Sequence, residues 1–167
     1  MKKFLACFII MCTVVSMGSI SYAAYNSSER SFDSIESALK SSAVSGRIGG
    51  GYGDSKRMYG SVNEDDNEVD IYKFSIHLDG QDYLSFKLQV PDGNDYDLYV
   101  LDYYGDVIAK SSRGVGENEY ITINDPDILE YARKCENCRD NFYVKIECFS
   151  GDSSSQYRLD VKTVDGN

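Results

Sequence analysis

The most regular part of the sequence is YLSFKLQVPDGNDYDLYVLD, residues 83–102. Its first half alternates strictly, because Leu84, Phe86 and Leu88 are apolar and the residues between them are polar. A period of two is typical of a strand with one face in a protein core. A Pro-Asp-Gly turn signal follows, and then a run around Tyr96 that is apolar on both faces, as expected of a central strand. The stretch therefore predicts two β-strands separated by a turn.

The same alternation recurs on both sides of this stretch. Apolar residues occupy every second position in residues 72–76, 142–148 and 157–161, and a weaker signal marks 121–123. Turn-forming residues separate these runs at intervals of about ten residues. Roughly six to eight short strands with this spacing predict an all-β fold, an antiparallel β-sandwich. The expected exception is one short helical insertion near residues 127–134.

The N-terminus has the features of a secretory signal. Two lysines precede an apolar run over residues 4–15, and Ser21-Tyr22-Ala23 offers the small residues that signal peptidase requires. The run is shorter than the ~20 residues that a spanning helix needs. We therefore expect residues 1–23 to be removed, leaving a secreted chain without a membrane span.

Residues 24–57 are predicted to be a lead-in to the folded domain. Four apolar residues in this segment have the spacing of one short amphipathic helix. They are Phe32, Ile35, Ala38 and Leu39. Residues 45–55 contain five glycines and are expected to form a flexible linker. A glycine-rich phosphate loop is not favoured, because no Lys-Ser/Thr pair and helix follow. The folded domain is then expected to span residues 58–164.

The chain is acidic. It has 17 lysines and arginines against 27 aspartates and glutamates, a net charge of −10. Removal of the signal takes away two lysines and no acid, which leaves 15 basic residues and a net charge of −12. Because the sequence shows no basic stripe that would neutralise phosphates, this balance argues against nucleic acid or an anionic membrane surface as partner. It suits the binding of cations.

Three segments carry motifs that occur together, in this order, in a known family. They are residues 59–74 with the acidic run 63–66, residues 94–111 with Asp95-Tyr96-Asp97-Leu98-Tyr99, and residues 141–161. Together they resemble the bacterial pre-peptidase C-terminal domain, whose relatives include the collagen-binding domains of bacterial collagenases. The resemblance implies a jelly-roll β-sandwich that serves a secreted protease in substrate binding, targeting or secretion. No protease domain accompanies it here, so we expect a free-standing copy.

Six acidic residues are candidate calcium ligands. They are Glu64, Asp65, Asp66, Asp70, Asp95 and Asp97. Calcium takes six to eight oxygen ligands, several of them carboxylates that loops bring together. The resemblance implies such a site, because some collagen-binding relatives hold calcium between an acidic linker and the sandwich. The alternative is that these are solvated surface acids, and the spacing of an EF-hand is absent.

Five aromatic residues are predicted to lie on exposed parts of a sheet and to bind a ligand. They are Tyr99, Tyr103, Tyr104, Tyr143 and Phe149. Flat amphipathic rings suit an extended ligand such as collagen or a polysaccharide, because they give contact area at little cost in entropy. The alternative is that these rings are bulky strand formers, partly covered. The collagen-binding relatives have paired tyrosines where this chain has Glu147-Cys148-Phe149, so collagen itself is not favoured.

The cysteines predict a disulfide rather than a catalytic group. Cys135 and Cys138 lie close together in an insertion, and in an exported chain such a pair is expected to form a local disulfide. Cys148 shares the apolar face of its strand and is expected to be a buried thiol. A redox pair, a zinc site that includes His77 and an intermolecular bond are the alternatives.

No catalytic arrangement stands out in the sequence. His77 is the only histidine, and no Gly-x-Ser-x-Gly motif is present. We therefore expect a secreted, non-catalytic binding module that contacts an extracellular polymer or a protein partner, with calcium as its one candidate cofactor. The alternatives are a chaperone, targeting factor or inhibitor that acts in trans on a secreted protease, and a small secreted hydrolase.

Overall fold

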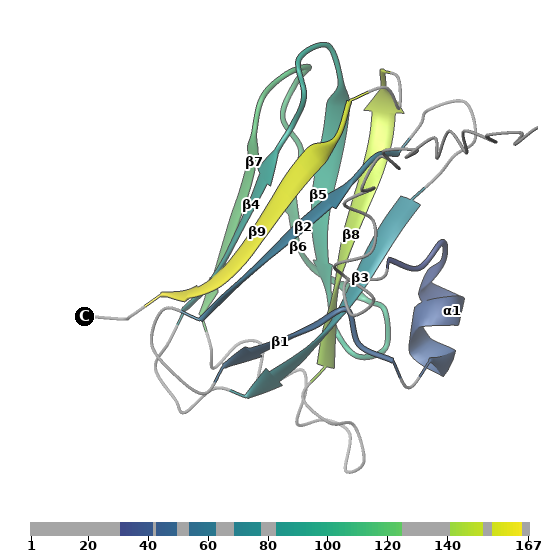
Figure 1. Cartoon of the computed structure of the whole chain (residues 1–167), viewed down its shortest axis with the longest axis vertical. Helices are drawn as coiled ribbons and strands as arrows, with labels where there is room; N and C mark the ends of the chain where they lie inside the picture. Colours follow the sequence, from purple (N-terminus) through teal and green to yellow (C-terminus); the bar gives the residue numbers. More distant parts are fainter. Residues whose placement is uncertain are drawn as a thin grey trace, which may run out of the picture.

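The structure is a computed structural model that describes residues 31–41, 43–49, 54–62, 69–77, 83–124, 141–151 and 155–164. Within these ranges the chain forms one short helix and nine strands (Figure 1). In chain order they are α1 (Ile35–Lys40), β1 (Gly46–Gly49), β2 (Ser55–Gly60), β3 (Val69–His77), β4 (Tyr83–Gln89), β5 (Asp95–Leu101), β6 (Val107–Ser111), β7 (Glu119–Asn124), β8 (Asn141–Ser150) and β9 (Tyr157–Val164).

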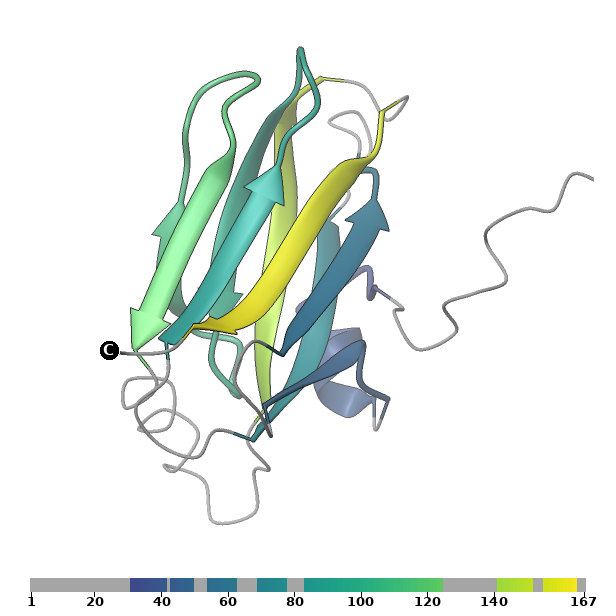
Figure 2. The same ribbon diagram turned by 60° about the vertical axis from the view of Figure 1, so that its left-hand side comes forward.

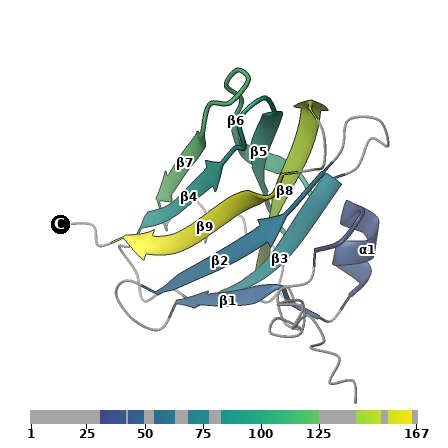
Figure 3. The same ribbon diagram turned by 45° about the horizontal axis from the view of Figure 1, so that its top comes forward.

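The strands form two sheets that pack face to face. Sheet A has five strands in the order β1-β3-β8-β5-β6, and sheet B has four in the order β2-β9-β4-β7 (Figure 3). Every pair is antiparallel except β1 and β3, which run parallel. The predicted all-β sandwich is therefore confirmed, with one parallel edge pair in addition.

The core lies between the sheets and is built by the alternation seen in the sequence. In β4, Leu84, Phe86 and Leu88 are fully buried, while the residues between them are only partly covered. Phe142 of sheet A stacks on a ring of its own sheet and meets the edge of Phe86 from sheet B, with centroids 5.6 Å apart. Such an edge-to-face pair adds to the free energy gained from apolar burial. The two inward faces therefore specify how the sheets pack.

The outer face of sheet A is partly covered by α1. The helix begins after Ser34, whose hydroxyl oxygen accepts a hydrogen bond from the backbone N–H of Ser37. Its buried Ala38 packs in a second apolar cluster with Ile71 and Tyr143 of sheet A. All four apolar residues that predicted a helix belong to this cluster, so the prediction of one short amphipathic helix is confirmed.

The prediction that residues 45–55 form a flexible linker is wrong for their first half. Gly46–Gly49 is strand β1, which pairs with β3 in the register Gly46 to Phe74. A Cβ atom at Gly46 would stand 3.1 Å from the ring of Phe74, so glycine permits this close approach of backbone to ring. Ile48 is buried in the main core. The glycines therefore allow a packed edge strand that composition alone did not indicate.

Three predicted features lie outside the described residues. They are the signal at 1–23, the helical insertion near 127–134 and the Cys135–Cys138 disulfide. The domain boundary at 58 falls within β2, which begins at Ser55. None of the helices in the described ranges is long and apolar enough to cross a membrane.

Candidate functional site: the outer face of sheet B

The outer face of sheet B is open in the described part of the chain. No described helix or strand lies over it, whereas α1 lies over sheet A (Figure 2). Because side chains alternate along a strand, every second residue of β2, β9, β4 and β7 points outward. The outward residues are Ser55, Arg57, Tyr59, Arg158, Asp160, Lys162, Val164, Tyr83, Ser85, Lys87, Gln89, Tyr120, Thr122 and Asn124. We call this set the basic face.

The strand registers align these side chains in rows across the sheet. The first row runs Arg57, Asp160, Lys87, Tyr120; the second runs Ser55, Lys162, Ser85, Thr122; the third runs Tyr59, Arg158, Gln89. Neighbouring strands lie ~4.8 Å apart, so a row of four side chains spans ~14 Å. The basic face is therefore a broad surface with charge spread over it.

Cations outnumber acids on this surface. Among its residues, Arg57, Lys87, Arg158 and Lys162 are positive and Asp160 is negative, so four cations and one acid leave a net charge of +3. The whole chain, in contrast, has a net charge of −10. The basic face is thus a local reversal of the protein's overall charge.

The one acid of the basic face is shared between two arginines. Nε of Arg57 lies 2.6 Å from one carboxylate oxygen of Asp160, and Nε of Arg158 lies 2.8 Å from the other. The hydrogen bond that Arg57 donates to Asp160 is the main reason that the pKa of Arg57 is raised. One carboxylate cannot neutralise two guanidinium groups, so positive charge remains available to an anionic ligand.

Tyr120 is flanked by two cations. Nζ of Lys87 and Cζ of Arg113 each lie 5.4 Å from the centre of its ring. Arg113 comes from the segment before β7, outside the strands of the basic face, and adds one more positive charge beside it. Tyr120 is 45% exposed and Tyr59 is 56% exposed. Both rings are therefore accessible, and cations surround one of them.

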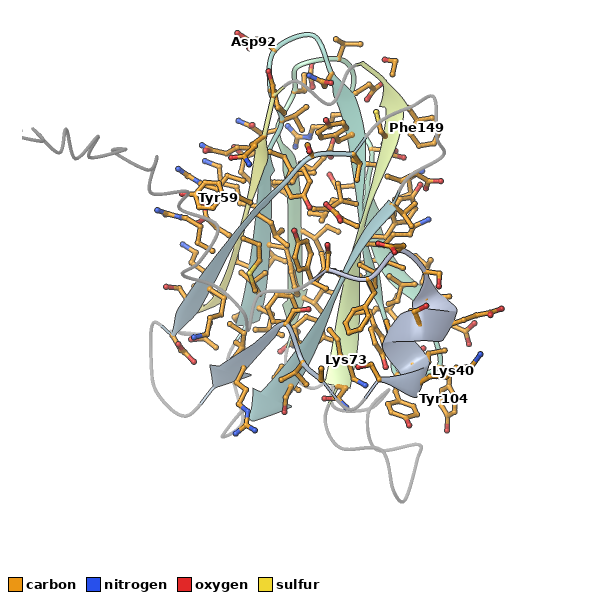
Figure 4. The ribbon with its side chains drawn as sticks, turned by 45° about the vertical axis from the view of Figure 1, so that its right-hand side comes forward. Lys40, Tyr59, Lys73, Asp92, Tyr104 and Phe149 are labelled. Carbon is orange, nitrogen blue, oxygen red and sulfur yellow. The ribbon has the colours of Figure 1, made fainter. Side chains whose placement is uncertain are left out.

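The five aromatic residues predicted as a ligand face lie on the sheet A side of the molecule, where two of them are buried and Tyr103 is half-buried. Tyr143 is 0% exposed and Tyr99 is 8% exposed, because both pack in the apolar cluster that includes Ala38. Tyr104 and Phe149 are exposed, and the ring of Tyr103 packs edge-on against Tyr104. The expectation of exposure is thus wrong for Tyr99 and Tyr143. Figure 4 shows Phe149 and Tyr59 on opposite sides of the sandwich.

Tyr99 is held between charged groups of the neighbouring strands. Nζ of Lys145 lies 4.1 Å from the centre of its ring and Nζ of Lys110 lies 4.8 Å from it. The Tyr99 hydroxyl donates a hydrogen bond to the carboxylate of Asp97. The same carboxylate forms an ion pair with Lys110, whose Nζ lies 2.8 Å from its oxygen. Burial raises the pKa of Tyr99 to about 12. These charged groups interact with one another, so little unpaired charge remains beside Tyr99 for a ligand.

The structure does not bring the predicted calcium ligands together. Asp70 lies opposite Ile146 in the register and faces the core side of sheet A, whereas Asp97 lies opposite Glu147 and faces outward. Neighbours across antiparallel strands share a face, so the carboxylates of Asp70 and Asp97 point to opposite faces and do not form one site. Asp95 is half-buried at the start of β5. Glu64, Asp65 and Asp66 lie outside the described residues, and calcium binding stays a prediction.

The remaining candidate residues are placed as follows. In the described part of the chain, no group of three histidine, cysteine or acidic side chains could hold a metal ion. Cys148 is half-buried against the main core, and its thiol donates a hydrogen bond to the carbonyl of Ser150 at 3.5 Å. His77 is the last residue of β3. Cys148 in β8 and His77 at the end of β3 therefore lie on the strands in which the sequence predicted them.

Comparisons with known proteins give matches among solved structures. No protein-family model and no curated protein matches the sequence. The structure is similar to the crystal structure of the pre-peptidase C-terminal domain of collagenase from Bacillus anthracis. The two share 11% sequence identity and a TM-score of 0.42, over 71% of this chain and 92% of that chain. This is the family that the sequence motifs resemble.

The basic face was missed from the sequence for an identifiable reason. Its four cations come from three strands, and Arg57 and Lys162 are more than 100 residues apart. A search for neighbouring basic residues finds no stripe, because the sheet alone brings these positions side by side. A signal was nevertheless present. Arg158, Asp160 and Lys162 occupy every second position on the polar side of the strand predicted at residues 157–161.

Proposed function

We propose that this protein is a secreted, non-catalytic binding module that contacts an extracellular polymer or a protein partner through the basic face. The observation that carries the proposal is the patterning of that face. Cations and exposed tyrosines occupy outward positions on a sheet that no described element covers. Arginine and tyrosine are enriched at binding surfaces, since both give large contact areas and hydrogen bonds.

The scaffold supports this role through its rigidity. Each strand of the basic face is pinned from beneath by fully buried side chains, such as Met58 in β2, Phe86 in β4 and Leu159 in β9. A surface whose backbone is already ordered loses little conformational entropy when a ligand binds. Secretion is proposed from the signal-like N-terminus, and it would place the basic face in contact with matrix, cell wall and secreted proteins.

The test is a retention assay on these materials. Purified protein would be incubated with insoluble cell wall, with extracellular matrix and with immobilised secreted proteins, and the bound fraction measured. The variant Arg57→Gln/Lys87→Gln/Lys162→Gln removes three cations of the basic face. We expect it to lose at least tenfold in retention on the material that binds the wild-type protein. Circular dichroism would verify that the variant remains folded.

A matched control separates the face from total charge. The variant Lys40→Gln/Lys110→Gln/Lys145→Gln removes the same number of charges from α1 and sheet A, and we expect it to be retained like the wild type. Equal losses in both variants, or no retention of the wild type on any material, would contradict the proposed function. Selective retention on a secreted protease would favour the accessory role in trans.

A further inference from the structure

We infer that the basic face binds a polyanionic polysaccharide, a chain of sugar rings with repeated carboxylate, sulfate or phosphate groups. This inference rests on the proposed function and names the ligand class of that same face. Three observations support it: the reversal of charge, the spacing of the cations and the chemistry of the residues between them.

Charge selects an anionic ligand. The basic face has a net charge of +3 within a chain of net charge −10, and Arg113 adds a further cation beside Tyr120. Lys162 is exposed, and the side chain of Arg57 is 55% exposed despite its ion pair with Asp160. Exposed charges of one sign attract an oppositely charged ligand over about a Debye length, ~8 Å at physiological salt. The rest of the acidic surface would repel the same ligand and so orient it onto this face.

Spacing selects a polymer over a single small anion. Arg57 and Lys87 lie in one row with β9 between them, so their backbones are ~10 Å apart. Arg158 and Lys162 are four residues apart along β9, which corresponds to ~13 Å. These are separations of the backbone, and one sulfate or phosphate group is too small to contact all four cations of the basic face at once, whereas anionic groups repeated along a chain can. Among the described residues no helix or strand lies over this sheet, so such a chain can extend along it.

The intervening residues select sugars over a protein surface. Protein interfaces have an apolar, desolvated centre, but Val164 at the end of β9 is the one aliphatic side chain among the outward residues of the four described strands. The second row instead offers the hydroxyl groups of Ser55, Ser85 and Thr122 beside Lys162. Hydroxyl groups donate and accept hydrogen bonds, as sugar hydroxyls do. Tyr59, 56% exposed, presents a ring on which the apolar side of a sugar can pack.

The inference is tested by titration calorimetry of the purified protein with four probes: polygalacturonate, dextran sulfate, neutral dextran and single-stranded DNA. We expect binding to one or both acidic polysaccharides, no heat with neutral dextran, and a fall in affinity of at least tenfold between 50 and 500 mM salt. The Arg57→Gln/Lys87→Gln/Lys162→Gln variant should lose at least tenfold in affinity. The charge-matched Lys40→Gln/Lys110→Gln/Lys145→Gln variant should stay within threefold of the wild type.

A second variant distinguishes a sugar ligand from a general polyanion. Tyr59→Ser keeps every charge, and we expect it to weaken polysaccharide binding at least threefold. DNA that binds as tightly as the polysaccharides would overturn the inference in favour of nucleic acid. Equal binding of neutral dextran, or no polysaccharide binding, would also overturn it. The proposed function would still stand if the basic-face variant lost retention in the assay described above, and it would fall if that loss were absent too.

Discussion

The hydroxyl group of Tyr157 in β9 donates a hydrogen bond to the carboxylate of Asp70 in β3, so one residue of each sheet meets the other across the interior. The same hydroxyl lies 2.7 Å from that of Tyr72, and both tyrosines are buried. Burial raises the pKa of Asp70 above its ordinary value and raises that of Tyr157 well above its own. The sandwich thus contains a polar link between its sheets, and this link is sensitive to protonation.

Asp70→Asn is expected to remove part of the pH dependence of stability. Because the pKa of Asp70 is raised in the folded state, mainly by burial, the folded protein holds this proton more tightly than the unfolded chain. Its contribution to stability is present in full below the ordinary pKa of about 3.9 and is lost as the pH rises through the folded value. We expect the free energy of unfolding of the variant, relative to wild type, to increase as the pH rises from about 3.9 to the folded pKa of Asp70, and to stay constant above it.

Urea unfolding at a series of pH values would measure this difference. Asp92→Asn is the control, because Asp92 lies exposed in the turn between β4 and β5 (Figure 4). A difference between Asp70→Asn and wild type that stays constant with pH would show that Asp70 has the same pKa in both states. That result would exclude the role given to burial.

Two Tyr→Phe substitutions are expected to have different effects on stability. Tyr157→Phe removes a buried hydroxyl that bonds both Asp70 and Tyr72, and we expect it to destabilise by about 1–3 kcal/mol. The hydroxyl of Tyr143 is buried and has no hydrogen-bond partner among the described residues, so Tyr143→Phe should leave stability unchanged or increase it. Chemical unfolding of both variants under one condition compares them directly. Equal losses would show that the Tyr157 hydroxyl makes no special contribution.

Gly60→Ala is expected to disturb the same polar link. A Cβ atom at Gly60 would stand 2.5 Å from an oxygen of Asp70 and 2.6 Å from Cζ of Tyr157. Overpacking of this kind typically costs about 1–3 kcal/mol. Gly114→Ala is the control, because a Cβ atom there meets nothing within 4 Å. Thermal unfolding should show a lower midpoint for Gly60→Ala alone, and an unchanged midpoint would mean that the sheets move apart at little cost.

Lys73→Met is expected to loosen α1 from sheet A. Nζ of Lys73 donates hydrogen bonds to the carbonyl oxygens of Ala38 at 3.3 Å and Ser41 at 2.7 Å, at the C-terminal end of the helix. Carbonyl groups at this end lack partners within the helix, and a cation also interacts favourably with the helix dipole. Hydrogen exchange should become faster in residues 35–41 of the variant. Lys40→Met, which removes an exposed lysine of the same helix, should leave the exchange unchanged (Figure 4).

Local alternation was sufficient to predict the sandwich, and pairing between distant strands was not. Leu84, Phe86 and Leu88 identify β4 in any reading of the sequence, because the period of two places all three on one buried face. Tyr99 and Tyr143 also alternate with core residues, yet they are buried, because both pack in an apolar cluster with residues of α1 and two lysines also lie over the ring of Tyr99. The alternation of residues along a strand does not show whether another part of the chain covers its outward face. The burial of these two tyrosines could therefore not be predicted from the sequence.

The same limit applies to the candidate site. The sequence indicated a polar outer side for β4 and β9 separately, but the neighbours of each charge depend on strand order. Arg57 meets Asp160 because β2 pairs with β9, and Lys87 joins that row because β9 also pairs with β4. Strand order in a sandwich is a long-range property. The basic face therefore becomes visible only with the fold.

The central position of the two last strands has a consequence for how the chain folds. β8 lies between β3 and β5 in sheet A, and β9 lies between β2 and β4 in sheet B. In each sheet, therefore, the last strand of the chain pairs with two earlier strands. Pairs such as Ser55 with Lys162 must close loops of about a hundred residues, and folding that depends on such distant contacts is slow. A chain synthesised or exported from its N-terminus would hold β1 to β7 without their central partners until β8 and β9 arrive. Folding is then expected to be completed only after the whole chain has emerged, and a chain cut before residue 141 would expose unpaired strand edges to aggregation.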